Sequence, residues 1–428
     1  MNNSDKLFNK MVNSRNLTKD DVSENDESVE ILPGDFKPKF YDDIKISLLF
    51  EDTNPEVYCV GTVESDNYLK IDKNKLEFME TLINITDGEK TIDEIGKTLC
   101  SIYAISSYRS FYTMLGQYGL LKNYKLKKKS DLNIFSISLF SLNISKFCLS
   151  ISAIVPMIIS IFKVAYLFIF SVLLGLIIAK IIDPFTMFNV ENSSFIETIL
   201  VTLLYIIPTI VTHEFSHMIV AIKHKLHPNQ LKVSLYMLIY PLIYVVIPGI
   251  YFVKRKERIW ILSAGLIWNS FFMMLSIIIG NIFSINIFKE VAYSNLIVIA
   301  INLIPFFLSD GYFILCNLMK TSNIRKDFSL FIMSFVNKSI DRKKIFKSKF
   351  SVFYIIMSTL FLLYGMYGLG SNFTSWFYNF LYSRWSIELN KSFFIPMSIS
   401  SGTYVFFLLM LSTNMPKRKK KPKKRKRK

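Results

Sequence analysis

The chain has only four histidines, and two of them have the spacing of a metal site. The 428-residue sequence contains Ile210-Val-Thr-His213-Glu214-Phe215-Ser216-His217 within an apolar stretch. Residues four apart on a helix project from one face, so His213 and His217 can fill two corners of a zinc tetrahedron. Glu214 is placed to accept a proton from a water at the metal. Chance predicts only roughly 0.003 occurrences of His-Glu-x-x-His here, which disfavours the alternative of a polar patch bonded to neighbouring helices.

A catalytic zinc needs a third protein ligand, and Asp310 is the candidate. It lies in Asn302-Leu-Ile-Pro305-Phe-Phe-Leu-Ser-Asp310-Gly311, where an acid in apolar surroundings needs a cation or metal as its partner. If both segments are helical, His213 lies about 27 Å and Asp310 about 24 Å from the start of its own span, so the two should meet at a similar depth. The alternative role for Asp310 is to cap a helix that follows the proline.

The other two histidines, His224 and His227, lie in the segment Lys223-His-Lys-Leu-His-Pro228. They could form a second metal site or a proton relay. Because the chain here leaves an apolar helix for a lysine-rich loop, we expect both to be solvated.

Membrane helices must position these residues, since 51% of the chain is hydrophobic. An apolar segment needs about 20 residues to cross about 30 Å of hydrocarbon. Six segments qualify: Val164–Ile182, Phe195–Val220, Trp260–Ile282, Ser294–Met319, Phe350–Leu369 and Ser392–Leu411. Two other apolar stretches, Phe135–Phe162 and Val233–Phe252, are interrupted by prolines, and the sequence leaves open whether they are interfacial, re-entrant or spanning.

Loop charges orient the predicted spans. Lys and Arg together outnumber Asp and Glu by 18, and cytoplasmic loops are rich in Lys and Arg. Residues 221–232 and 254–258 hold seven basic residues and 320–349 hold nine, whereas the loops on the opposite side hold at most two each. The chain is thus predicted to be a multi-pass protein of the cell membrane with both termini in the cytoplasm.

The last twelve residues, Lys417 to Lys428, contain eleven basic residues. Such a run resembles a nucleic-acid patch or a nuclear signal. Directly after a membrane span, however, it is better explained by contact with anionic lipids, at about 1 kcal/mol per basic residue near the surface. We therefore expect the lipid bilayer as a partner and no nucleic acid.

A small soluble domain is predicted before the membrane helices. Alternating residues at Glu56–Val63 and Tyr68–Asp72 indicate strands, and three stretches of helical period follow. The second of these begins with the capping box Thr91-Ile-Asp-Glu94, and the third ends at Gly119. The four cysteines are far apart and form no Cys-x-x-Cys pair, which excludes a disulfide scaffold or a cysteine-based zinc knuckle.

The membrane motifs resemble the site-2 protease family of intramembrane zinc metalloproteases. His-Glu-x-x-His in one helix and Asn-x-x-Pro-x-x-x-x-Asp-Gly in a later one carry this resemblance, together with Ala264-Gly265-Leu266-Ile-Trp-Asn269, in which Leu266 replaces the usual proline. The resemblance implies a zinc endopeptidase in which His213, His217 and Asp310 bind Zn²⁺ and Glu214 is the general base. It also implies that Asn269 and Asn302 contact the substrate backbone or the oxyanion. The alternative for both is simple helix–helix hydrogen bonding.

Residues 56–123 resemble the PqqD-like winged-helix domains known as RiPP recognition elements, through their order of two strands and three helices and the closing Tyr118-Gly119-Leu120-Leu121. This resemblance implies that the domain binds the leader of a ribosomally made, modified peptide as an added strand at a sheet edge. The alternative is a DNA-binding winged helix. Its third helix, however, carries one basic residue, Arg109, which is too little charge to grip phosphates.

The sequence thus predicts a polytopic α-helical membrane protein of about six transmembrane helices with a small α+β winged-helix-like cytoplasmic domain. We expect it to bind and cleave the leader or precursor of a modified peptide. Two alternatives stay open: a non-proteolytic immunity or export component, and a regulated intramembrane protease acting on a membrane-bound regulator. The predicted divisions are a disordered arm at 1–38, a peptide-recognition domain at 39–129, an interfacial segment at 130–163, a protease core at 164–320, a basic loop at 321–349, C-terminal transmembrane helices at 350–412 and a basic tail at 413–428.

Overall fold

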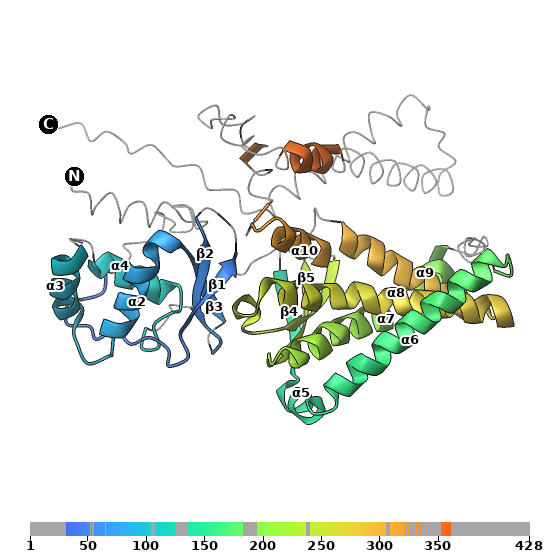
Figure 1. Ribbon diagram of the computed structural model, residues 1–428, viewed down its shortest axis with the longest axis horizontal. Coiled ribbons are helices and arrows are strands. Elements are labelled where there is room, and N and C mark those ends of the chain that lie inside the picture. Colours follow the sequence, from blue (N-terminus) through green and yellow to red (C-terminus); the bar gives the residue numbers. More distant parts are fainter. Residues whose placement is uncertain are drawn as a thin grey trace, which may run out of the picture. The chain divides into compact units, whose positions relative to one another are not determined.

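The computed structural model describes most of the chain between residues 31 and 321 (Figure 1). The described residues are 31–51, 53, 55–64, 66–103, 108–124, 136–182, 195–236, 240–304, 309–321 and a few later ones, chiefly the helical residues 352–360. The chain divides into two compact units, and all elements named below belong to the first, which includes Asn25–Ser322.

The small domain is an antiparallel sheet covered on one face by three helices (Figure 1). Its strands, in the order β1-β2-β3, are β1 (Lys45–Phe50), β2 (Val57–Thr62) and β3 (Asn67–Asp72). A short turn, η1 (Lys73–Lys75), leads into α2 (Leu76–Ile85), α3 (Ile92–Tyr103) and α4 (Tyr108–Gln117). The predicted strands and helices are thus present, and β1 is an additional strand that the sequence did not reveal.

Local signals in this domain act as predicted. The Glu94 carboxylate accepts the Thr91 N–H at 2.8 Å, and the Thr91 hydroxyl accepts the Glu94 N–H at 3.3 Å, which is the predicted capping box. The predicted domain boundary at residue 39 lies too late in the chain. Leu32 is buried in the core of the domain, and its N–H bonds to the Thr113 hydroxyl at 2.9 Å. Residues 32–38, predicted as part of a disordered arm, thus belong to the folded domain, and residues 1–30 of that arm lie outside the described residues.

Strand β3 has two differently occupied faces because its side chains alternate. Leu69 and Ile71 belong to the core beneath the helices. Tyr68 and Lys70 point the other way, toward the residues 249–252 that precede a membrane helix. One strand therefore joins the interior of the small domain to the rest of the molecule.

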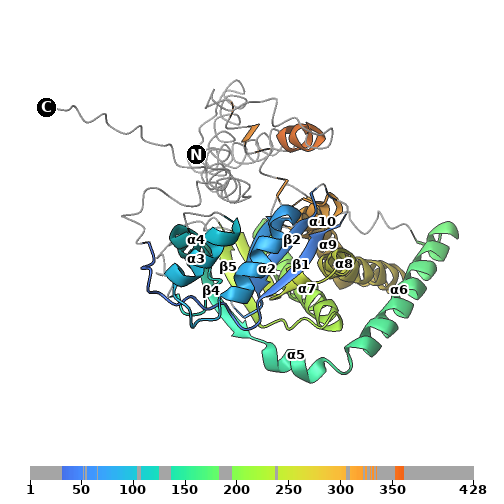
Figure 2. The ribbon, with the colours of Figure 1, turned by 60° about the vertical axis from the view of Figure 1, so that its left-hand side comes forward.

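The membrane region contains α6 (Val155–Ile178), α7 (Phe195–Lys223), α8 (Arg255–Phe283), α9 (Asn286–Leu303) and the short α10 (Asp310–Leu318). Among the described residues, three helical segments are long and apolar enough to cross a membrane: α6, the Leu204–Lys223 part of α7, and α8. Helix α6 lies at the outside of the helix group (Figure 2), and none of its apolar window is buried, as suits a lipid-facing surface. The length and composition of these helices are consistent with membrane association.

Helices α6, α7 and α8 support the first three of the six predicted spans. The fourth, Ser294–Met319, is not one helix, because α9 ends at Leu303 and α10 begins at Asp310. Of the fifth, Phe350–Leu369, only residues 352–360 are described, and they are helical. The sixth span, most of the basic loop at 321–349 and the tail at 413–428 lie outside the described residues.

A second three-stranded antiparallel sheet resolves the two ambiguous apolar stretches. Its order is β4 (Ser136–Asn143), β5 (Gln230–Tyr236) and β6 (Tyr240–Val246). The stretch 135–162 becomes β4, then α5 (Ser145–Ile151) and then the first turns of α6, where Pro156 is tolerated because it sits in the first turn. The stretch 233–252 is a strand hairpin followed by the turn η3 (Ile250–Phe252), so no helix spans a membrane there.

Candidate metal centre

His213, His217 and Asp310 meet at one point, although 97 residues separate the first from the last. The Nε2 atoms of His213 and His217 lie 2.8 Å and 3.1 Å from the same carboxylate oxygen, Oδ2 of Asp310. Both histidines are buried, and the Asp310 side chain is 18% exposed. Asp310 is the first residue of α10 and follows the helix cap at Ser309, so its carboxylate serves the histidines instead of capping the helix.

Helix α8 makes room for the His213 ring. Gly265 on α8 lies so close to His213 that a Cβ at this position would overlap the Cε1 and Nε2 atoms of the imidazole. The ring therefore lies directly against the backbone of α8. This close approach fixes where α7 and α8 cross relative to the metal-binding face.

Helix α8 also holds the inner nitrogens of the two imidazoles. His217 Nδ1 donates to the Ile261 carbonyl at 2.6 Å. Because a carbonyl only accepts, Nδ1 carries a proton, and Nε2, which bonds to the Asp310 carboxylate here, is the nitrogen that a metal would use. The amide of Asn269 lies 3.0 Å from His213 Nδ1 and is fully buried.

These residues fit a metal ion by three observations. Their ligand atoms all lie within 4.8 Å of one another. Ligand atoms around a tetrahedral zinc are roughly 3.3 Å apart, a few tenths of an ångström more than the spacings found here, so only a small outward movement is needed. Finally, Asn269 Oδ1 is buried with no hydrogen-bond partner among the described residues. If its amide turns over, that oxygen accepts Nδ1–H of His213 and leaves Nε2 to a metal.

Glu214 lies beside this group and is held by the second sheet. Its Oε2 accepts the N–H of Val245, on β6, at 3.0 Å. It is also close enough to interact electrostatically with His213, His217 and Asp310. The carboxylate therefore stands between the metal-binding residues and the outer strand of the sheet.

The unpaired edge of β6 faces Glu214. Among the described residues β6 pairs only with β5, and the Val245 N–H that reaches Glu214 must point away from β5. In an antiparallel ladder, alternate residues direct their backbone groups to the same side. The carbonyl of Val245 and the backbone groups of Ile243 therefore line that edge next to Glu214.

Three residues that the sequence analysis named make their side-chain contacts outside this group. The Asn302 side chain bonds within its own helix, to the Val298 carbonyl at 3.1 Å, and only its backbone carbonyl approaches Gly311. His224 Nδ1 lies 3.6 Å from Glu257, and His227 is exposed. In the described part of the chain, the group able to hold a metal contains only His213, His217 and Asp310.

Sequence reasoning missed the partners that act through the backbone. The Ile261 carbonyl, the Val245 N–H and the bare α-carbon of Gly265 all shape the site. Nearly every residue type supplies the same backbone N–H and carbonyl, so no sequence motif could have pointed to Ile261 or Val245. Gly265 was visible as part of Ala264-Gly265, but its contact with His213 depends on how two helices cross.

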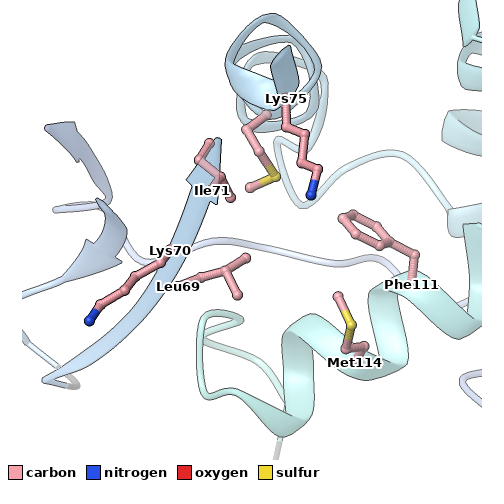
Figure 3. Close-up of a pocket in the computed structure, with 7 residues that line it drawn as sticks. Leu69, Lys70, Ile71, Lys75, Phe111 and Met114 are labelled. Carbon is pink, nitrogen blue, oxygen red and sulfur yellow. The ribbon is translucent and has the colours of Figure 1, made fainter. Parts of the chain in front are cut away.

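A second candidate site lies in the small domain, between β3 and the helices (Figure 3). The pocket is lined by Leu69, Lys70, Ile71, Lys75, Met79, Phe111 and Met114. Phe111 and Met114 reach from α4 toward β3, and the Lys75 amine points toward Phe111 (Figure 3). The volume is about 30 Å³, room for about one water, so a larger ligand would lie across it.

The third helix of this domain is poorly suited to DNA. Its one basic side chain, Arg109, pairs with both carboxylate oxygens of Asp93, at 2.9 Å and 2.6 Å. This pairing uses the charge within the domain.

The chain matches no protein-family model, no curated protein and no solved structure.

Proposed function

We propose that this protein is an intramembrane zinc endopeptidase that binds and cleaves the precursor of a ribosomally made, modified peptide. The observation that carries the proposal is the convergence of His213, His217 and Asp310 beside the carboxylate of Glu214. Two imidazoles and one carboxylate are the ligand set of a catalytic zinc with an open position. A bound zinc ion would supply a Lewis acid for a peptide carbonyl.

In this proposal Glu214 is the general base and acid. The Val245 N–H fixes one oxygen of its carboxylate, which leaves the other oxygen to remove a proton from the attacking water and to deliver it to the leaving amine. The Nδ1 atoms of His213 and His217 are hydrogen-bonded to α8, so their Nε2 atoms are preorganised. Asp310 balances the charge of a divalent cation in a region shielded from water.

The free edge of β6 supports an extended substrate. A peptide that adds to this edge as a further strand would pair with Ile243 and with the Val245 carbonyl, and its backbone would pass next to Glu214. Strand addition reads backbone groups and not side chains. Strand addition would therefore hold a peptide bond at the reacting position in substrate peptides of many different sequences.

The small domain would supply selectivity. Among the described residues β3 pairs only with β2, so its other edge is available for a leader peptide, and the pocket of Figure 3 opens beside it. Leu69, Phe111 and Met114 offer apolar contact to a leader side chain, whereas the Lys75 amine lies 3.9 Å from Asp72. A leader with an apolar anchor residue matches this lining.

The central test compares Glu214→Gln with His213→Ala in the full chain. Purified wild type and Glu214→Gln should each contain about one zinc per chain. His213→Ala should contain little zinc, because His213 is a zinc ligand in the proposal and Glu214 is not. The Glu214→Gln form, expressed in its native cells and crosslinked, should trap an uncleaved peptide for identification by mass spectrometry. Cleavage of that peptide by wild type and not by Glu214→Gln is the expected result. Cleavage by both would refute the mechanism, and a trapped membrane regulator would refute the peptide assignment.

The pocket can be tested with the same trap. Met114→Lys places a charge among the apolar lining of the pocket, and Gln117→Lys adds the same charge to an exposed position on the same helix. We expect Met114→Lys to reduce recovery of the trapped peptide about 10-fold and Gln117→Lys to leave recovery unchanged. Equal recovery from both variants would exclude this pocket as the leader site.

A further inference from the structure

Arg258, on α8, is buried where the small domain meets the membrane region. Its side chain is 1% exposed. Its Nη2 donates to the Leu49 carbonyl on β1 at 2.9 Å, and its Nε donates to Asn317 Oδ1 on α10 at 2.6 Å. Its Nη1 lies 3.4 Å from the Tyr251 carbonyl. One guanidinium therefore joins three segments that are distant in the sequence.

The surroundings of Arg258 show that this contact is specific. Its charge lies over the rings of Phe50 and Tyr251, at 5.7 Å and 5.9 Å from their centroids. All its hydrogen-bond acceptors are neutral, and no carboxylate pairs with it among the described residues. A buried cation with neutral acceptors costs free energy unless every donor direction is matched. Arg258 therefore favours the arrangement in which the Leu49, Tyr251 and Asn317 oxygens all face it.

Further contacts fix the same junction from the side of β3. Tyr68 Oη accepts the Gly249 N–H at 2.7 Å, and the Tyr68 ring packs edge-on against Tyr251 and Phe252. The Lys70 amine lies 5.4 Å from the centre of the Tyr251 ring. The small domain is thus bound to the turn η3 immediately before the helix that carries Arg258.

The junction leads to the metal-binding residues through α10. Asn317 lies seven residues after Asp310, which is two helical turns along the same face, or about 10 Å. The Asn317 amide bonds to the Phe313 carbonyl of its own helix at 2.8 Å while its oxygen holds Arg258. At the other end of α10, Gly311 packs against the carbonyls of Asn302 and Leu303. Helix α10 also packs against α8 and α9, and Arg258 adds the hydrogen bond at Asn317 that links this helix to the small domain.

We propose that Arg258 is a positioning residue and that docking of the small domain completes the metal site. The Leu49 carbonyl and the Phe50 ring hold the guanidinium against Asn317, which keeps α10 where Asp310 meets His213 and His217. The claim that this link controls cleavage rests on the proposed function. The claim that the link affects metal binding does not.

The same geometry connects the leader pocket with the metal site. Leu69 and Ile71 of β3 line the pocket, and Tyr68 and Lys70 of the same strand contact the junction from the opposite face. A peptide bound along the free edge of β3 would therefore lie beside the strand that carries Tyr68 and Lys70, whereas Leu49 lies on β1, at the other edge of the sheet. Occupation of the pocket would stiffen this strand and favour the complete site.

The test uses Co²⁺ as the probe, titrated into the detergent-solubilised full chain and followed by visible absorption. Tyr68→Phe removes the hydroxyl that accepts the Gly249 N–H and donates to Asp66 and that, among the described bonds, reaches no residue of α8 or α10. Arg258→Lys keeps the charge but cannot reach three acceptors together. Lys256→Ala is the matched control, an exposed position on the same helix. We expect Co²⁺ to bind about 10-fold more weakly to Arg258→Lys and about 3- to 10-fold more weakly to Tyr68→Phe, with Lys256→Ala unchanged.

Each outcome bears on a different claim. Combining Tyr68→Phe with Arg258→Lys should weaken Co²⁺ binding by less than the product of the single effects, because both act through one junction. Unchanged Co²⁺ affinity in Tyr68→Phe overturns the inference, since the small domain then has no influence on the site; this variant decides the matter even if Arg258→Lys does not fold. A wild-type chain that binds no Co²⁺ overturns the proposed metalloprotease itself.

Discussion

The imidazole of His213 rests against the bare α-carbon of Gly265, so these two residues fix how closely α7 and α8 approach at the metal site. A methyl group at Gly265 would overlap the ring atoms that face Asp310. Overpacking of this kind costs about 1–3 kcal/mol.

We predict that Gly265→Ala weakens metal binding by about 5- to 150-fold, because the His213 ring must move away from Asp310. Gly175→Ala on α6 is the matched control, since no atom lies within 4 Å of a Cβ built there. Zinc affinity measured in detergent by competition with a chromogenic chelator tests both variants. Equal affinities for the two would show that the ring has room to adapt.

Asn269 is expected to hold His213 in the tautomer that binds metal. Asn269→Leu removes the only described partner of His213 Nδ1 and should reduce metal affinity about 10- to 100-fold. Asn269→Asp retains an acceptor oxygen and should recover most of that loss. Unchanged metal affinity in Asn269→Leu would show that Asn269 does not position His213 and would favour its direct role in substrate contact.

Removal of the metal should destabilise the membrane region. Binding at 100 times the dissociation constant stabilises a fold by about 2.7 kcal/mol, so a chelator should lower the thermal unfolding midpoint of the wild-type chain. His213→Ala and Asp310→Asn should show no such difference with or without chelator. A wild-type midpoint that ignores the chelator would mean that the three side chains pair with one another and hold no ion.

The loop between β2 and β3 should loosen in acid. Burial pulls the pKa of Asp43 upward, but hydrogen bonds from the Thr62 hydroxyl and from the Glu64 and Val63 amides outweigh it, so the pKa lies below its ordinary 3.8. A lowered folded-state pKa stabilises the fold above the unfolded pKa, and this contribution is lost as the pH falls through the folded value.

Hydrogen exchange of residues 57–64 measures this effect. Protection should be constant above about pH 5 and should decrease below about pH 4 beyond the change in intrinsic rate. In Asp43→Asn the protection should be lower throughout and independent of pH. Asp42→Asn is the control: Asp42 is exposed, its pKa is lowered by its bond to Lys122, and it makes no contact with this loop among the described bonds. A pH dependence that survives Asp43→Asn would locate the titrating group elsewhere.

The sequence by itself determined those features that depend on neighbours along the chain. The four-residue spacing of His213 and His217 places both on one face of any helix, and the capping box at Thr91 and Glu94 is equally local. Long apolar runs predict membrane helices because the bilayer thickness sets their length. Asp310 was identified because a lone acid in an apolar segment must find a partner.

Only the tertiary structure decided which distant segments meet. Strand β4 pairs with β5 across about ninety residues of sequence, so the apolar stretch at 135–162 could not be assigned from its own composition. The Val245 N–H at Glu214 and the Ile261 carbonyl at His217 are backbone groups that any residue type would supply. Arg258 looked like one of several basic residues in a loop, and its burial between Leu49 and Asn317 arises from contacts 209 and 59 residues apart. Such pairings depend on how whole elements pack, which no local pattern records.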